Sequence, residues 1–211
     1  MSLRALFALV LLTVVCGAAP LTRDLGEGVT YVRVRALPAD LPEQLRSDMV
    51  LDLRFARTDS AASAALAGWL QFRSAPDATL VILINRETHA EIRQTLTQTL
   101  PLPGTLLIGP ASADPAPDLE LESDPELERL AYTALERDTS VESLIRENTA
   151  KPRHDEASFS GTRRELAELE PSEAELSDDP PRETPLVDHA LQRAVHVHRA
   201  FRALPRGDPV R

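Results

Sequence analysis

Cysteine is almost absent from this chain of 211 residues, in which Cys16 is the only one. Because Cys16 lies in a segment with the features of a secretory signal, the exported chain would carry no cysteine. Disulfide bonds, a thiol nucleophile and cysteine ligands for a metal are therefore excluded for the mature protein. Its stability must come from a hydrophobic core.

Lysine is equally scarce, since Lys151 is the only one in the sequence. Any mechanism that needs an amine, such as a serine–lysine pair or a Schiff base, must use this residue. The arginines are interleaved with acids and form no basic run. With 33 acidic against 23 basic side chains and a net charge of −10, the composition argues against nucleic acid as a partner.

A long hydrophobic run is also missing, because the apolar stretch at residues 5–15 is too short to cross a bilayer comfortably. Arg4 precedes this stretch and small residues come after it, which is the pattern of a cleaved secretory signal. We expect cleavage after Ala18, so that the mature chain begins near Ala19 without a stable membrane span and is periplasmic or secreted. In the alternative, Cys16 accepts a lipid and anchors the protein to a membrane.

Several short apolar segments predict β-strands. Apolar and polar side chains alternate over residues 28–35, as in a half-buried strand, and residues 49–55 predict a second strand. Residues 79–84 are almost continuously apolar, which is typical of a strand covered on both faces. Further strands are expected over residues 104–109 and, more briefly, 118–121.

Helices are expected between and after these strands. Residues 60–72 are rich in alanine, residues 88–99 have apolar side chains four apart, and residues 125–148 come directly after the capping residue Asp124. Trp69 and Phe72, near the end of the first helix, are expected in the core. Strands that alternate with helices predict an α/β fold with parallel pairing.

The domain organisation is indicated by a change in composition. Residues 19–149 form the predicted α/β domain, and residues 150–185 are polar, acidic and rich in proline, which predicts a mostly disordered linker. Apolar side chains return at helical intervals over residues 186–205 and predict an amphipathic helix. This helix is a candidate for docking on the core or for swapping onto a second copy, which would make a homo-oligomer.

The order of these segments resembles the core of S41-type tail-specific (C-terminal processing) peptidases. The matching motifs are YVRV at 31–34, an acidic helix at 41–46, VLDLR at 50–54, LVILIN at 80–85, THAEI at 88–92, LIG at 107–109, and PDLE with DPEL at 117–127. Each motif is weak alone, but their order and spacing are moderately specific. The resemblance implies a single domain of the ClpP/crotonase-like type, built from ββα layers.

The catalytic groups implied by this resemblance are missing. His89 stands about where the family has its serine nucleophile, and no serine lies between Ser74 and Ser112. The family's lysine base belongs in a stretch that here, at 109–115, contains no lysine. The family's glycine pair, whose backbone approaches the oxyanion, is replaced by residues 55–60, which contain no glycine. The resemblance therefore implies a scaffold without its catalytic residues.

Thr88 and His89 are the remaining candidates for a catalytic pair. Thr88 lies beside His89 and Glu91 at a predicted helix start, and Ser60 is a further candidate nucleophile for His89. The simpler interpretation is that Thr88 is the N-cap and accepts a hydrogen bond from the amide of Glu91. We therefore assign no catalytic residue.

Three further groups of titratable residues stand out in the sequence. His189, His196 and His198 are seven and two residues apart, whereas chelation from one helical face needs a spacing of three or four, so a solvated face is expected. The residues at 154–156 (His-Asp-Glu) lie in the predicted linker and form a poor metal site. Asp52 and Arg54 interrupt an apolar strand, and they either reach its solvent-exposed end or pair across the sheet. We predict neither a metal site nor a cofactor.

The leading hypothesis is an exported, non-catalytic S41 peptidase-like protein that acts by binding or assembly, with a protein or peptide as partner. One alternative is a serine- or threonine-type peptidase with relocated catalytic residues. Another is an unrelated α/β interaction domain. Strand order would separate the first hypothesis from the last, because a doubly wound sheet would contradict the resemblance.

Overall fold

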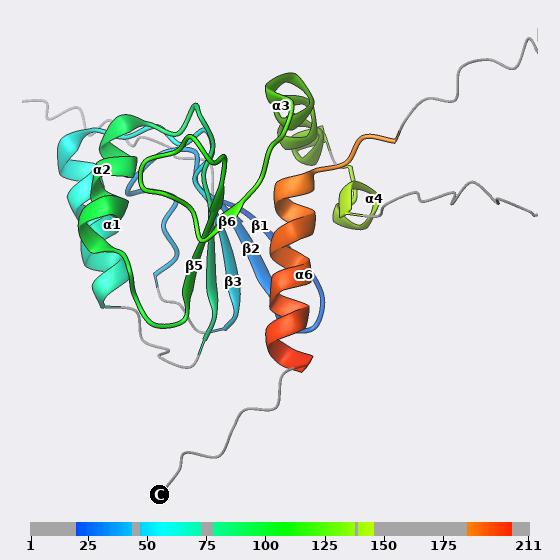
Figure 1. Ribbon diagram of the computed structural model, residues 1–211, viewed down its shortest axis with the longest axis horizontal. Coiled ribbons are helices and arrows are strands. Elements are labelled where there is room, and N and C mark those ends of the chain that lie inside the picture. Colours follow the sequence, from blue (N-terminus) through cyan, green and yellow to red (C-terminus); the bar gives the residue numbers. More distant parts are fainter. Residues whose placement is uncertain (1–19, 44–46, 73–77, 138, 146–184, 204–211) are drawn as a thin grey trace, which may run out of the picture. The chain divides into compact units, whose positions relative to one another are not determined.

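The protein has an α/β fold, as the sequence predicts: a six-stranded, mostly parallel sheet with helices (Figure 1). The chain divides into two compact units, Met1–Glu122 with Ala194–Arg211, and Ser123–Arg193. The predicted signal at 1–18 and nearly all of the predicted linker lie outside the described residues. The computed structural model describes residues 20–43, 47–72, 78–137, 139–145 and 185–203.

The strands of the sheet are arranged in chain order, with no reversal. The first pair is an antiparallel hairpin, and every later pair is parallel. The sheet is therefore not doubly wound. The strands are β1 (Leu21–Asp24), β2 (Thr30–Arg33), β3 (Met49–Asp52), β4 (Leu80–Leu83), β5 (Thr105–Gly109) and β6 (Leu119–Glu120).

Strand β1 was not predicted from the sequence. It has only four residues, and its side chains are partly or fully exposed, so no apolar run marks it. The turn that joins it to β2 contains Gly26, Glu27 and Gly28, all with positive φ. Glycine adopts this conformation without steric cost at two of the three positions, which allows the tight antiparallel hairpin.

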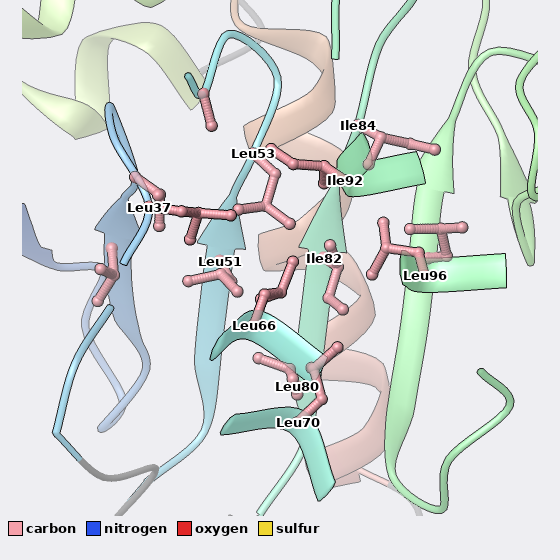
Figure 2. Close-up of a cluster of buried hydrophobic side chains, with 14 of the residues drawn as sticks. Leu37, Leu51, Leu53, Leu66, Leu70, Leu80, Ile82, Ile84, Ile92 and Leu96 are labelled. Atoms are coloured by element: carbon pink, nitrogen blue, oxygen red, sulfur yellow. The ribbon is translucent and has the colours of Figure 1, made fainter. Parts of the chain in front are cut away.

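Two helices, α1 (Ser60–Gln71) and α2 (Ala90–Thr99), lie on one face of the sheet. Asp59 caps α1 by accepting a hydrogen bond of 2.8 Å from the amide of Ala62. Apolar side chains from both helices meet those of β3 and β4, as Figure 2 shows. The labelled core residues are Leu37, Leu51, Leu53, Leu66, Leu70, Leu80, Ile82, Ile84, Ile92 and Leu96.

The expectations for Trp69, Phe72 and the segment at 41–46 have different outcomes. Trp69 packs at the margin of the core and donates from its indole nitrogen to the carbonyl of Pro42 at 2.7 Å. Phe72 was expected in the core, but it is 83% exposed because α1 ends at Gln71 and leaves it outside the packed face. The acidic segment expected to be helical at 41–46 bends at 41–43, and its remainder lies outside the described residues.

The unit Ser123–Arg193 contains shorter helices than predicted. Instead of one helix over 125–148 there are α3 (Pro125–Ala134), a 3-10 turn (Leu135–Arg137) and α4 (Val141–Ile145). The break has a local cause, because the Ser140 hydroxyl accepts from the amide of Ser143 and starts a new helix. The first turn of α6 (His189–Ala203) is tied to α4, since the side-chain amide of Gln192 donates to the carbonyl of Ile145 at 3.0 Å.

The C-terminal part of α6, residues 194–203, belongs to the same unit as the sheet. It lies on the face opposite α1 and α2 (Figure 1), where His198 approaches the carbonyl of Met49. A helix was expected over residues 186–205, and α6 occupies most of that range. None of the helices in the described part of the chain is long and apolar enough to cross a membrane.

Two glycines in this architecture should respond oppositely to alanine. A Cβ on Gly109, at the end of β5, would lie 2.6 Å from Cγ1 of the buried Ile84, whereas a Cβ on Gly68, inside α1, would meet no atom within 4 Å. We expect Gly109→Ala to lower the free energy of unfolding by about 1–3 kcal/mol and Gly68→Ala to raise it by about 0.5–1 kcal/mol. Urea titration of both variants checks this, and equal effects would contradict the close approach of β5 to Ile84.

Candidate functional site

The start of α2 is where the resemblance would place a nucleophile, and Thr88 is buried there. Its hydroxyl accepts from the amide of Asn85 at 2.9 Å. Three acceptors lie within reach of its single proton: the carbonyls of Leu53 and Arg54, both at 3.3 Å, and the Asn85 side-chain oxygen at 3.2 Å. With 2% of its surface exposed, Thr88 connects the end of β3 to the turn before α2 rather than facing a substrate.

His89 is exposed and occupies the N-cap position of α2. Its ring Nδ1 accepts a hydrogen bond of 3.3 Å from the amide of Glu91. The prediction that Thr88 caps this helix was therefore wrong, because the Thr88 hydroxyl is held by the Asn85 turn instead. Since Nδ1 serves as the acceptor of a cap, its lone pair is not available to take a proton from a nucleophile in this conformation.

In the loop at 55–60, where the resemblance would place a glycine pair, the amide and the carbonyl of Arg57 are both hydrogen-bonded within the protein. The amide of Arg57 donates to the carbonyl of Arg35 at 2.8 Å, and the carbonyl of Arg57 accepts from the amide of Leu37 at 2.9 Å. These bonds form a parallel bridge between the segments that come after β2 and β3. Ser60, the other candidate nucleophile, is exposed at the first position of α1, beyond the capping residue Asp59.

The turn after β5 stands where the resemblance would place a lysine. Its Pro110 carbonyl accepts from the amide of Ala113 at 2.8 Å, which closes a tight turn. A pocket of about 350 Å³ lies between this segment and α2. Its lining residues are mostly of polar type and carry both signs of charge, but include no histidine: Ala90, Arg93, Gln94, Thr97, Gln98, Ser112 and Asp114.

A group of charged and polar side chains from β2, β3 and the residues directly after β3 is buried in the protein. Oδ1 of Asp52 accepts a hydrogen bond of 3.0 Å from Nε of Arg54. Oδ2 of Asp52 accepts one of 2.8 Å from a terminal guanidinium nitrogen of Arg54. The Tyr31 hydroxyl donates to Oδ2 of Asp52 at 2.6 Å, and Nε of Arg33 donates to the same hydroxyl at 3.1 Å. All four side chains are completely buried, and we call them the Asp52 cluster.

Geometry explains why these four side chains meet. Arg33 pairs with Asp52 in the parallel register of β2 and β3, and side chains two residues apart on a strand share a face. Their neighbours Val32, Leu51 and Leu53 point into the core on the side of α1 and α2. The Asp52 cluster therefore lies on the opposite face of the sheet.

The charges of the Asp52 cluster determine its protonation. Burial opposes ionisation of Asp52, but the positive charge of Arg54, with hydrogen bonds from Arg54 and Tyr31, outweighs burial and lowers the pKa of this carboxyl. Burial and the neighbouring Asp52 charge raise the pKa of Tyr31 well above its ordinary value. The cluster thus holds an ionised carboxylate and a neutral phenol, and neither has the exposure that a substrate would need.

The histidines of α6 differ from one another in environment. His189 and His196 are exposed, whereas His198 is 1% exposed and faces the sheet, so the expectation of a solvated face fails for His198. Among the residues that the structure describes, no three histidine, cysteine, aspartate or glutamate side chains come together as a metal site would require. The residues at 154–156 lie outside the described residues.

Sequence reasoning identified part of this arrangement and missed part. Of the two alternatives for Asp52 and Arg54, pairing is the one observed, but Asp52 pairs with Arg54 two residues further along its own segment, and Tyr31 joins the pair from the neighbouring strand β2. Tyr31 and Arg33 were not predicted as members of the cluster. Their signal was present, since Tyr31 with Arg33 and Asp52 with Arg54 are each polar side chains two residues apart at the carboxyl end of a strand.

No protein-family profile matches this chain, and no curated protein matches it.

The Asp52 cluster should dominate the stability of the sheet. Asp52→Asn removes the charge while keeping the shape, and it leaves the buried Arg54 guanidinium without its counter-charge. We expect the free energy of unfolding to fall by about 3–5 kcal/mol at neutral pH, as measured by urea titration. Asp114→Asn, in an exposed loop, is the matched control and should change stability by no more than about 0.5 kcal/mol.

The same cluster predicts a pH dependence with a definite sign. Because the folded pKa of Asp52 is lowered, its contribution is complete above the unfolded value of about 3.9 and is lost as the pH falls through the folded value. The stability gap between wild type and Asp52→Asn should therefore close on acidification below about pH 4. A gap that stays constant down to pH 2 would show that the charge is not what stabilises the fold.

Proposed function

We propose that this chain is an exported, non-catalytic S41 peptidase-like protein that acts by binding a protein or peptide, or by assembly. One observation carries the proposal. Where the resemblance would place a nucleophile, the ring of His89 caps α2 and the neighbouring Thr88 hydroxyl is buried among backbone acceptors. A peptidase needs an exposed nucleophile within reach of a base, and these side chains serve the fold instead.

The strand order supports the finer fold proposal, a ClpP/crotonase-like arrangement of ββα layers. A sheet whose strands keep the order of the chain without reversal is compatible with such a superhelical arrangement, whereas a doubly wound order would count against it. The helices α1 and α2 each come after a strand and cover the same face. This regular succession favours the S41-like proposal over an unrelated α/β domain with a switch point.

The backbone around the same edge supports the loss of an oxyanion site. Oxyanion stabilisation requires amides that point at the substrate and have no other partner. In the loop after β3, the amide of Arg57 is already bonded to the carbonyl of Arg35. An accessible, polar pocket beside α2 gives a peptide a surface to contact without offering a base. Assembly through the C-terminal helix is the alternative route to function.

The first test is incubation of the chain from Ala19 onward with an unstructured peptide library, followed by mass spectrometry. We expect no cleavage by wild type, His89→Ala or Thr88→Val. In the same samples, the free energy of unfolding of His89→Ala should be lower by about 0.5–2 kcal/mol, because the N-cap of α2 is lost. His89→Asn should keep the N-cap and the wild-type stability.

Both outcomes of the cleavage assay are informative. Cleavage by wild type that disappears in His89→Ala but not in a control such as His196→Ala, on the exposed side of α6, would overturn the non-catalytic proposal. Without cleavage, the same library is passed over immobilised folded protein and over protein held in urea. Peptides retained only by the folded protein would support binding, and their absence would leave assembly, measured by light scattering, as the function to be tested.

A further inference from the structure

The C-terminal part of α6 is held against the sheet by three polar contacts that all lie near the amino ends of β2 and β3. His198 Nε2 is 3.3 Å from the carbonyl oxygen of Met49. Arg202 Nε is 3.3 Å from Oδ2 of Asp48, which directly precedes β3. Arg199 Nε is 3.5 Å from Oε1 of Glu27, in the turn before β2. We call residues 194–203 the α6 strap.

Of these contacts, only the one made by His198 is fully buried. The arginine contacts of the strap are at least partly exposed, with 52% and 54% of the Arg199 and Glu27 side chains accessible, so each contributes little. His198, by contrast, is 1% exposed. A small hollow between the strap and the β1–β2 hairpin has Leu25, Val29 and Val195 in its lining, so the strap covers apolar surface of this hairpin.

The bonding of His198 fixes its tautomer. A carbonyl oxygen can only accept, so Nε2 must carry the hydrogen that it donates to Met49. In the neutral ring, Nδ1 then carries a lone pair and no hydrogen. This nitrogen is buried and has no hydrogen-bond partner among the described residues. A second proton would have to bind to Nδ1. The N–H formed there would find no hydrogen-bond acceptor in the described structure and no access to water.

The charged groups around His198 do not offset this burial. Burial lowers the pKa of the ring, the Arg202 charge acts in the same direction, and the Asp48 charge and Met49 carbonyl oppose them without reversing the shift. Asp48 is also occupied already, since its Oδ1 accepts from the amide of Thr79 and its Oδ2 from Arg202. Arg199 and Glu27 are paired at the exposed rim, and His196 faces solvent.

We propose that the α6 strap is a pH-sensitive element, held on the sheet while His198 is neutral and released when His198 takes up a proton. When the α6 strap is released, the His198 ring has an ordinary pKa of about 6.5. It then takes up a proton more readily than when the strap is docked on the sheet. The docked state is therefore favoured above about pH 6.5 and weakened as the pH falls below it. Release would uncover the apolar side of the hairpin that Val195 covers.

The test is hydrogen exchange of the full chain at pH 7.5 and pH 5.5, with each rate divided by the intrinsic rate at that pH. For amides of residues 198–203 we expect the opening equilibrium to rise up to about tenfold at pH 5.5, the limit for one linked proton over this interval. Amides of β4 report on global unfolding and should change much less. Equal protection of the α6 strap at both pH values would overturn the proposal.

Two variants identify the histidine responsible. His198→Gln keeps a donor for the Met49 carbonyl but cannot be protonated, so the pH effect should disappear; if it persists, His198 is not the sensor. A second variant, with Gln at His89, His154, His189 and His196, leaves His198 as the only histidine and does not disturb the buried contact. It should keep the full effect, and loss of the effect there would also overturn the proposal.

Discussion

The buried ion pair between Asp52 and Arg54 is the interaction on which the β2–β3 region of the sheet depends. An ionised carboxylate without exposure to solvent is tolerated only when charge and hydrogen bonds compensate it. Here Arg54 supplies both, and Tyr31 adds a further donor from β2. Because Tyr31 belongs to one strand and Asp52 to the next, the cluster links these two strands through their side chains as well as their backbones. A register slip of one residue would bring Val32 opposite Asp52, or Leu51 opposite Arg33, and would take the Tyr31 hydroxyl away from the carboxylate.

The carboxyl ends of these strands in turn position the segments beyond them. Residues after β2 and β3 form a bridge through Arg57, and the carbonyls of Leu53 and Arg54 lie within reach of the Thr88 hydroxyl. The start of α2 is thus connected to the end of β3 by the buried Thr88 side chain. At this edge, where α/β proteins commonly bind ligands, the polar groups that we describe act as internal supports.

The sequence predicted the elements whose signal is local and failed where the outcome depends on contacts distant along the chain. The run at β4 and the spacing of Ile92 and Leu96 were sufficient, because burial on both faces or on one helical face leaves a periodic pattern. Phe72 was misplaced because one residue decides whether a side chain falls inside or beyond the end of α1. The cap of α2 was assigned to Thr88 because threonine is the better cap in isolation, and nothing local reveals that Asn85 and the end of β3 hold its hydroxyl. The burial of His198 could not be inferred for the same reason, since its partner is 149 residues away.

That separation has a consequence for how the chain folds. Every strand of the sheet pairs with its neighbour in sequence, so each addition closes only a short loop and loses little chain entropy. The contact of α6 with Met49 is of a different kind, because it must wait until His198, 149 residues further along the chain, has been made and brought back to the sheet. In a chain that emerges from its amino end, the sheet and the helices α1 and α2 can form in order of synthesis, whereas the surface that α6 covers stays open until residues 194–203 have been made.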